Sequence, residues 1–184
     1  MRVLGLSGSL RRASHNSKLL RAAGDTLPPG ASLEIYDGLR FIPPYDEDQE
    51  HLAPDTVLAL REAIRESDAV LFATPEYNAS IPGHLKNALD WMSRPLKISP
   101  LRGKPVAVVG ASTGLFGAVW AQAEVRKVLG AIGAKVVDRE LPVGQAADAF
   151  TEDGRLVDGD LELILADLLA ELLGDVREAV AEAA

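Results

Sequence analysis

Residues 69–91 read AVLFATPEYNASIPGHLKNALDW, and this stretch decides the fold. Its first five residues are all apolar, as expected of a strand covered on both faces of a parallel sheet. Turn-forming residues follow, and Pro82 then suits the first turn of a helix, where its missing N–H is harmless. A buried strand, a turn and a helix in this order form one repeat of an α/β protein.

The same alternation extends along the chain on both sides of this stretch. Strands are expected at residues 3–7, 32–36, 69–73, 105–110 and 134–137. Helices are expected at residues 17–26, 55–66, from Pro82 onward, 116–132 and 160–182, with a proline-containing loop at 39–52. This pattern predicts an α/β fold with a doubly wound, five-stranded parallel sheet of order 2-1-3-4-5 and helices on both faces.

Length and composition limit the protein class. A chain of 184 residues predicts a single domain over residues 1–184. The absence of cysteine excludes disulfides, thiol chemistry and cysteine-ligated metals, and the three histidines lie too far apart to suggest a metal site. No apolar run approaches the roughly 18 to 20 residues of a membrane span, and the N-terminus begins a strand-like run, which together predict a cytoplasmic protein.

The charge distribution argues against two classes of partner. Residues 152–184 carry ten acids and two bases, which accounts for the whole net charge of −8. Nucleic acids and anionic membranes need clustered lysine and arginine, so neither is an expected partner. One local cluster, Arg11, Arg12, Lys18 and Arg21 with His15 among them, contains no acid and could bind a small anion.

Three loops are expected to form one site. In the order 2-1-3-4-5 the winding reverses between the first and third strands, and ligands bind outside the carboxyl ends of the strands at that point. The segments 7–16, 75–80 and 112–117 follow three neighbouring strands. We therefore expect these loops to converge.

The first loop has the chemistry of a phosphate site. It offers backbone N–H groups, a helix N-terminus, several hydroxyls, an Asn amide and Arg11, which together suit a phosphate dianion. Its spacing is neither a Walker A loop nor Gly-x-Gly-x-x-Gly. The alternative is a tight turn with Arg11 in solvent.

The other two loops suit a flat ring. Tyr77 and Asn78 could face a heteroaromatic ring, although an ordinary strand-to-helix turn with Tyr77 as surface cover explains them equally well. The third loop is small and flexible enough for a ligand to lie against its backbone.

Three segments together resemble the NAD(P)H-dependent FMN reductase family, which includes bacterial quinone, chromate and azo reductases. They are Gly8-Ser9-Leu10-Arg11 with Ser14 and Asn16, the long run from Pro75 to Trp91, and Gly103-Lys104-Pro105-Val106. The resemblance covers residues 3–137 in order. It implies a flavodoxin-like fold, non-covalent FMN and a homodimer or a tetramer built from dimers.

The resemblance also assigns roles by position. Residues expected at the FMN phosphate are Ser9, Arg11, Ser14, Asn16 and Ser17. Residues expected to hold the isoalloxazine through their backbone are Pro75, Glu76, Tyr77 and Asn78, with Ser112, Thr113 and Gly114 closing the third side. The chain departs from some quinone-reducing members at Ala79 and at Ala118-Val119-Trp120, which leaves substrate preference and tetramer contacts open.

The implied activity is that of an oxidoreductase. Hydride from NADPH or NADH passes to FMN, and two electrons then pass to a small acceptor such as a quinone, an azo compound or a metal oxyanion. The flavin carries this chemistry, so no catalytic side chain and no metal are expected. The alternatives are a flavodoxin-type electron carrier and a flavin-binding regulatory protein.

A dimer contact is expected along the helix that starts near Pro82. Leu85, Leu89 and Met92 share one face of this helix, with Trp91 beside it, which is more apolar surface than one crossover helix requires. The alternative is that all four side chains are buried within one monomer.

Overall fold

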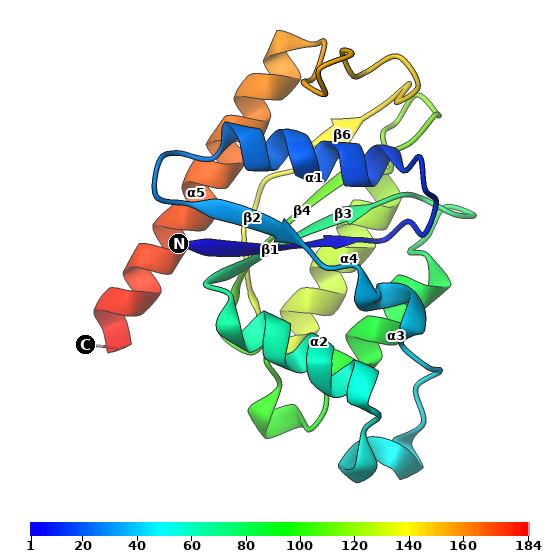
Figure 1. Cartoon of the computed structure of the whole chain (residues 1–184), viewed down its shortest axis with the longest axis vertical. Coiled ribbons are helices and arrows are strands. Elements are labelled where there is room, and N and C mark those ends of the chain that lie inside the picture. Colours follow the sequence, from blue (N-terminus) through cyan, green and yellow to red (C-terminus); the bar gives the residue numbers. More distant parts are fainter. Residues whose placement is uncertain (184) are drawn as a thin grey trace.

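The apolar run at 69–73 lies at the centre of the sheet, as the sequence predicts. The structure, a computed structural model, describes residues 1–183 and places β3 (Ala69–Thr74) between two parallel neighbours, β1 (Arg2–Ser7) and β4 (Pro105–Ala111). All six residues of β3 are buried. The strand order β2-β1-β3-β4-β5 confirms the predicted fold class (Figure 1).

The remaining elements alternate with these strands along the chain. The other strands are β2 (Ser32–Ile35), β5 (Lys135–Val136) and β6 (Pro142–Val143). The α-helices are α1 (His15–Thr26), α2 (Asp55–Glu66), α3 (Gly83–Met92), α4 (Val119–Ile132) and α5 (Gly159–Ala183). Three short 3-10 helices are η1 (Gly38–Phe41), η2 (Glu47–Leu52) and η3 (Leu96–Ile98).

The fifth strand is interrupted, so the sheet has six strands instead of the predicted five. β5 pairs with the start of β4 at Pro105 and Val106, whereas β6 pairs with its end at Gly110 and Ala111. Residues 137–141, of which 138–140 are charged, separate the two pieces. The consequence is a second stretch of chain beside the carboxyl end of β4, close to the expected site.

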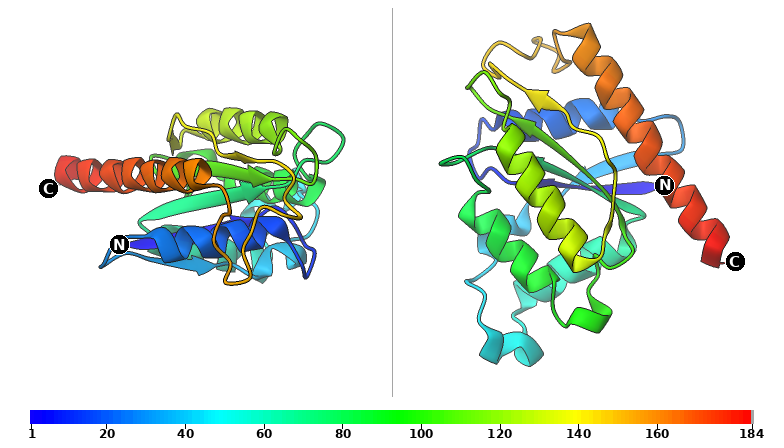
Figure 2. Two further views of the ribbon diagram at one scale, coloured as in Figure 1. Left: turned by 90° about the horizontal axis from the view of Figure 1, so that it is seen from above. Right: turned by 180° about the vertical axis from the view of Figure 1, so that it is seen from behind.

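Two helical layers enclose the sheet (Figure 2). On one face α1 and α5 cover small residues, among them Ala69, Ala73 and Ala107. On the other face α2, α3 and α4 cover larger residues, among them Phe72 and Val108. Alternation of side chains along each strand sends neighbouring residues to opposite layers.

Several boundaries differ from the predictions for local reasons. α4 starts at Val119 instead of residue 116, because Gly117 and Ala118 have φ of +57° and +63°, outside the helical region. Pro82 is the N-cap of α3 and lies just before its first turn. α1 starts at His15, two residues before the predicted position, and the predicted loop at 39–52 contains η1 and η2.

The apolar face of α3 is buried inside the monomer. Leu85, Leu89, Trp91 and Met92 are each at most 2% exposed. The indole Nε1 of Trp91 donates to the Pro43 carbonyl at 2.9 Å, and its ring meets Tyr45 edge-on at 5.1 Å. The expectation that these side chains form a subunit contact is therefore wrong, and the alternative of burial within one monomer is correct.

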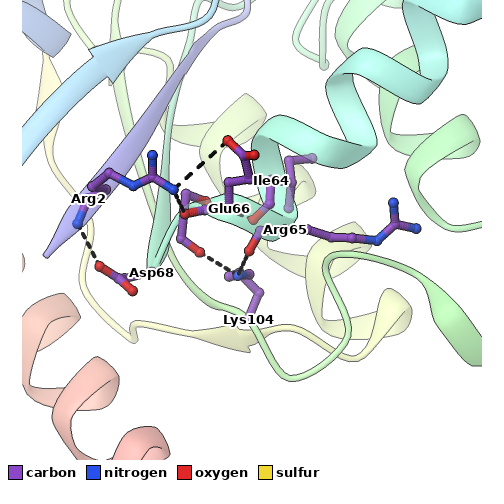
Figure 3. A network of polar contacts seen from close by, with 7 residues as sticks. Arg2, Ile64, Arg65, Glu66, Asp68 and Lys104 are labelled. Carbon is purple, nitrogen blue, oxygen red and sulfur yellow. Dashed lines mark hydrogen bonds and ion pairs between the residues drawn. The ribbon is translucent and has the colours of Figure 1, made fainter.

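Charged groups link the segments at the amino-terminal ends of β1, β3 and β4 (Figure 3). The Arg2 backbone N–H donates to the Asp68 carboxylate at 2.6 Å, and the Arg2 guanidinium binds the Glu66 carbonyl. Lys104 Nζ donates to the Ser67 carbonyl at 2.5 Å, just beyond the end of α2. Burial lowers the pKa of Lys104, while the nearby Asp68 opposes that shift.

No helix within residues 1–183 combines the length and hydropathy needed to cross a bilayer.

Candidate functional site

The first loop is fixed between β1 and the start of α1. Ser14 caps α1, because its hydroxyl accepts from the Ser17 backbone N–H at 3.1 Å. The Gly8 backbone N–H donates to the Ala73 carbonyl at 2.8 Å, which ties the loop to β3. A Cβ on Gly8 would lie 2.9 Å from the end of the Leu85 side chain on α3 and 3.2 Å from Pro75, so the first loop packs closely against α3 and the second loop.

Asn16 joins the first loop to the third. Its side-chain amide donates to the Ala111 carbonyl at 2.9 Å, and its Oδ1 accepts from the Ala111 N–H at 3.0 Å. The residue is 2% exposed. Asn16 therefore positions the first loop against the end of β4, a role that the sequence did not indicate.

The second loop is a tight turn. Tyr77 and Ser80 exchange two backbone hydrogen bonds of 3.1 and 3.2 Å. Asn78 and Ala79 between them have φ of +54° and +58°, the left-handed pair that a two-residue turn of type I′ requires. Asn78 consequently lies at the exposed tip of the loop, and Tyr77 is 46% exposed.

Two carboxylates hold the second loop against α4. Glu76 Oε2 accepts from the backbone N–H groups of Trp120 and Ala121 at 3.1 and 3.2 Å. In the other direction, Glu124 Oε2 accepts from the Ser80 hydroxyl at 2.5 Å and from the Ile81 N–H at 3.3 Å. The loop and the start of α4 are thereby linked at two points.

Glu76 takes the place of a missing N-cap. The residue at the N-cap of α4 is Ala118, which has no side chain that could accept a hydrogen bond. The Glu76 carboxylate satisfies two N–H groups of the first turn and also interacts favourably with the positive end of the helix dipole. An alanine where a helix should begin with a capping residue is the one sequence signal that could have indicated this role.

The third loop is fixed more firmly than its small residues suggested. A Cβ on Gly117 would lie 2.3 Å from the backbone of Pro142, so the loop packs directly on β6. The Ser112 N–H donates to the Val143 carbonyl at 3.1 Å, and the Gln145 N–H donates to the Gly114 carbonyl at 2.9 Å. These bonds link the loop to β6 and to the segment that follows it.

The three loops meet around one cleft, as predicted. It has a volume of about 140 Å³ and includes nine of the twelve predicted site residues. Its lining consists of Ser9, Arg11, Ser14, His15, Asn16, Pro75, Glu76, Tyr77, Ala111, Ser112 and Thr113. Of the other three predicted residues, Ser17 lines a neighbouring cavity, whereas Asn78 and Gly114 are exposed.

His15 is a lining residue that the predicted site omits. Its ring stacks on Phe150 with 6.4 Å between centroids and an interplanar angle of 9°. Its buried Nδ1 has no hydrogen-bond partner among residues 1–183. Burial, followed by the charges of Arg11 and Lys18, lowers the pKa of His15.

The cleft provides the groups that a flat, singly phosphorylated ligand requires. The exposed Arg11 guanidinium donates to the Ala13 carbonyl at 3.0 Å and carries its charge at the start of α1. Hydroxyl groups of Ser9 and Ser14 lie on the same side, and the Tyr77 ring lies on the opposite loop. The chemistry of this lining agrees with a phosphate at one end and a ring at the other.

Comparison with known proteins identifies the family. Residues 1–148 match the family described as NADPH-dependent FMN reductase. The chain belongs to this family. The FMN reductase family is the one that the sequence motifs resemble, so the predicted family and the predicted class, an oxidoreductase, are confirmed.

Similar proteins in the FMN reductase family agree with this assignment. The chain is 47% identical over 160 residues to an NAD(P)H-dependent FMN reductase of Pseudomonas aeruginosa, covering 86% of this chain and 85% of that protein. It is 41% identical over 141 residues to a quinone reductase of Escherichia coli K12, covering 76% and 74%. FerB of Paracoccus denitrificans, a flavoenzyme NAD(P)H:(acceptor) oxidoreductase, has a TM-score of 0.84 and 34% identity, covering 96% and 97%.

Proposed function

We propose that the protein is an NAD(P)H-dependent FMN oxidoreductase that delivers two electrons to a small acceptor such as a quinone, an azo compound or a metal oxyanion. The observation that carries this proposal is the cleft at the carboxyl ends of β1, β3 and β4. It combines the first loop, which has the groups of a phosphate site, with the loop that carries Tyr77, at the point where the winding of the sheet reverses.

The lining residues fit FMN by their chemistry. Ser9, Arg11, Ser14 and Ser17 would hold the phosphate, and Asn16 would keep their loop in place. Pro75, Glu76, Tyr77 and Asn78 would hold the ring through their backbone, with Ser112, Thr113 and Gly114 on the third side. When bound, FMN supplies the redox chemistry, namely hydride acceptance and electron donation.

The protein side chains bind and orient but do not transfer protons. Glu76 is the only carboxylate of the cleft lining, and one of its oxygens is engaged by two backbone N–H groups of α4. The His15 ring is stacked on Phe150. Hydride transfer to a flavin needs no general base, so we infer that neither side chain serves as one.

The charge around the cleft favours an enzyme over a one-electron carrier. Carriers of flavodoxin type generally need an acidic patch around the flavin for docking, whereas Arg11 and Arg12 lie on the first loop here. The acids concentrate instead in the segment from residue 152 onward.

Anaerobic spectroscopy tests the proposal. The purified protein should show the visible spectrum of a flavin, and heat release followed by chromatography should yield FMN in stoichiometric amount. NADPH or NADH should bleach the spectrum, and quinones, azo dyes or metal oxyanions should restore it. A stoichiometric yield of FAD, or no bleaching by either nucleotide, would contradict the proposal.

Steady-state kinetics provides a second test. One face of the bound ring would lie against the protein, so donor and acceptor would have to use the same exposed face and bind in turn. Initial-rate plots at several acceptor concentrations should therefore be parallel, the ping-pong pattern. Converging lines would indicate that both substrates bind together.

We also propose a homodimer in the cytoplasm, with the surface beside the cleft as the contact. Leu115, Phe116 and Trp120 are 70%, 61% and 51% exposed, and the two aromatic rings pack edge to face at 5.3 Å. Such neighbouring exposed aromatics are typical of protein interfaces. Sedimentation at low concentration should show a dimer for the wild-type protein and a monomer for Trp120→Glu. A wild-type protein that sediments as a flavin-bound monomer would refute the proposed dimer. A dimer that the substitution leaves intact would refute the proposed contact.

A further inference from the structure

The turn at Asn78 and Ala79 has a backbone conformation that its own residues do not favour. Left-handed backbone is common for Asn but costly for Ala, because the Cβ comes too close to the following carbonyl oxygen. Ala79 nevertheless has φ of +58°, directly after Asn78 with φ of +54°. A residue other than glycine keeps such a conformation only where the surrounding structure determines it. Contacts on the flanks of the turn therefore have to hold it.

Two carboxylates supply contacts on these flanks. Before the turn, Glu76 binds the first turn of α4. After the turn, the Ser80 hydroxyl and the Ile81 backbone N–H both donate to Glu124 Oε2, at 2.5 and 3.3 Å. Glu124 thus binds the two residues that directly follow Ala79.

Glu124 acts on the second loop and not on the cleft itself. Its side chain is exposed, and within residues 1–183 it forms no ion pair. It does not line the cleft, so it makes no direct contact with a ligand there. Both of its side-chain hydrogen bonds go to the second loop. Any effect of Glu124 on the cleft consequently passes through that loop.

We propose that Glu124 is a positioning residue for the bound flavin, because it fixes the turn at Asn78 and Ala79 and thereby the backbone groups that hold the ring. The inference rests on the proposed function, in which the second loop holds the ring and the first loop holds the phosphate. Loss of the Glu124 contact lets Ala79 relax toward a right-handed conformation and reorients the neighbouring peptide groups. Ring binding weakens as a result, whereas phosphate binding does not.

Titration with FMN and with riboflavin separates the two ends of the site, since riboflavin lacks the phosphate. Glu124→Ala should weaken the binding of both flavins by the same factor, about three- to tenfold, as expected for hydrogen bonds at an exposed site. Arg11→Ala should weaken the binding of FMN alone. Lys127→Ala removes another exposed side chain of α4 and is the matched control, which should change neither affinity.

Two further variants test whether the position of the loop is responsible. Glu124→Gln removes the charge but keeps an acceptor oxygen, so it should restore most of the affinity. Glycine adopts the left-handed conformation readily, so Ala79→Gly makes the turn independent of the Glu124 contact. In the Ala79→Gly background, Glu124→Ala should weaken FMN binding by about twofold or less.

The midpoint potential of the bound flavin is a readout that a general loss of stability would not change. N5 of the ring accepts a hydrogen bond when oxidised and donates one when reduced, so a displaced backbone affects the two states unequally. Glu124→Ala should change the two affinities by factors that differ at least about threefold, which is about 14 mV for a two-electron couple. The potential of Glu124→Gln should lie closer to the wild-type value.

Several results would overturn the inference. Wild-type affinity of Glu124→Ala for both flavins would show that the contact does not position the ring, and a loss confined to FMN would place the effect at the phosphate. An equal loss in Glu124→Gln would show that the charge is responsible. An undiminished loss in the Ala79→Gly background would show that Glu124 does not act through the turn. A wild-type protein that binds neither flavin would instead refute the proposed function, and the inference with it.

Discussion

Charged residues have different roles at the two ends of the strands. The amino edge is the side of the sheet where β1, β3 and β4 begin, and the carboxyl edge is the side where they end. At the amino edge, Arg2, Glu66, Asp68 and Lys104 bind one another or the carbonyls beyond α2 (Figure 3). At the carboxyl edge, Arg12 and Arg21 have neither an ion pair nor a side-chain hydrogen bond among residues 1–183. The same residue types therefore stabilise the fold at one edge and remain available to a ligand at the other, and their partners distinguish the two cases.

The carboxyl edge also contains its own structural residues. Asn16 and Glu76 line the cleft, yet both use their polar atoms to join one loop to another element. Lining a cleft is thus a weaker indication of ligand contact than a free polar group. Variants at both edges can separate stabilising residues from ligand-binding ones.

The largest effect is expected for Asn16→Ala. The substitution leaves the buried N–H and carbonyl of Ala111 without their side-chain partner, which should cost about 2 to 4 kcal/mol of unfolding free energy. Urea unfolding of the FMN-free protein measures this. Arg102→Ala is the exposed control and should change stability by less than about 0.5 kcal/mol. An equally small loss for Asn16→Ala would refute its positioning role.

Arg11→Ala should weaken FMN binding by about 1.5 to 3 kcal/mol, the range for a charged hydrogen bond. Flavin fluorescence titration measures the affinity. Arg2→Ala at the amino edge is the matched control, because it should lower stability slightly and leave FMN affinity unchanged. Unchanged affinity in Arg11→Ala would mean that this guanidinium remains in solvent.

Glu76→Ala should lower the unfolding free energy by about 1 to 2 kcal/mol, because α4 loses its cap. Glu76→Gln keeps an acceptor oxygen and should cost less. Its turnover should fall by less than the roughly hundredfold expected on loss of a general acid or base. A thousandfold loss in Glu76→Gln with FMN still bound would show that this carboxylate takes part in the chemistry.

The smallest expected effect is a loss of folding stability at acidic pH. Burial lowers the pKa of His84 below 6.5, with a partial offset from its bond to the Gly8 backbone. The unfolded chain takes up its proton near pH 6.5 and the folded chain only at lower pH, so stability should fall as pH drops through that window. Urea midpoints between pH 5 and 8 should decrease less steeply in His84→Gln than in wild type. His51→Gln, an exposed histidine of η2, is the control, and an identical profile in all three proteins would contradict the prediction.

Much of the fold could be predicted because its signals are local. The apolar runs at β3 and β4, and the capping residue Ser14, each lie within a few residues of the structure they specify. Strand order then placed the three loops together. The resemblance to the FMN reductase family supplied the individual residues, nine of which line the cleft.

The remaining features depend on contacts between distant residues. Glu76 caps a helix 44 residues later, and Glu124 reaches Ser80 over the same separation, so no short motif contains either bond. An apolar stripe such as that of α3 looks the same whether it packs on its own monomer or on a second copy. The two residues of β6 are too few to show a periodic pattern.

The interrupted edge formed by β5 and β6 also affects how copies of the chain can meet. An unbroken outer strand presents a row of free backbone groups to which another chain can add by hydrogen bonding. Here five residues separate the two dipeptides, namely the buried Val137 and Leu141 and, between them, Asp138, Arg139 and Glu140. Arg126 binds both acids of this charged insert. Charges and breaks of this kind disfavour the addition of a further strand at this side of the sheet. β2 is the outer strand on the opposite side, and it is unbroken over Ser32–Ile35.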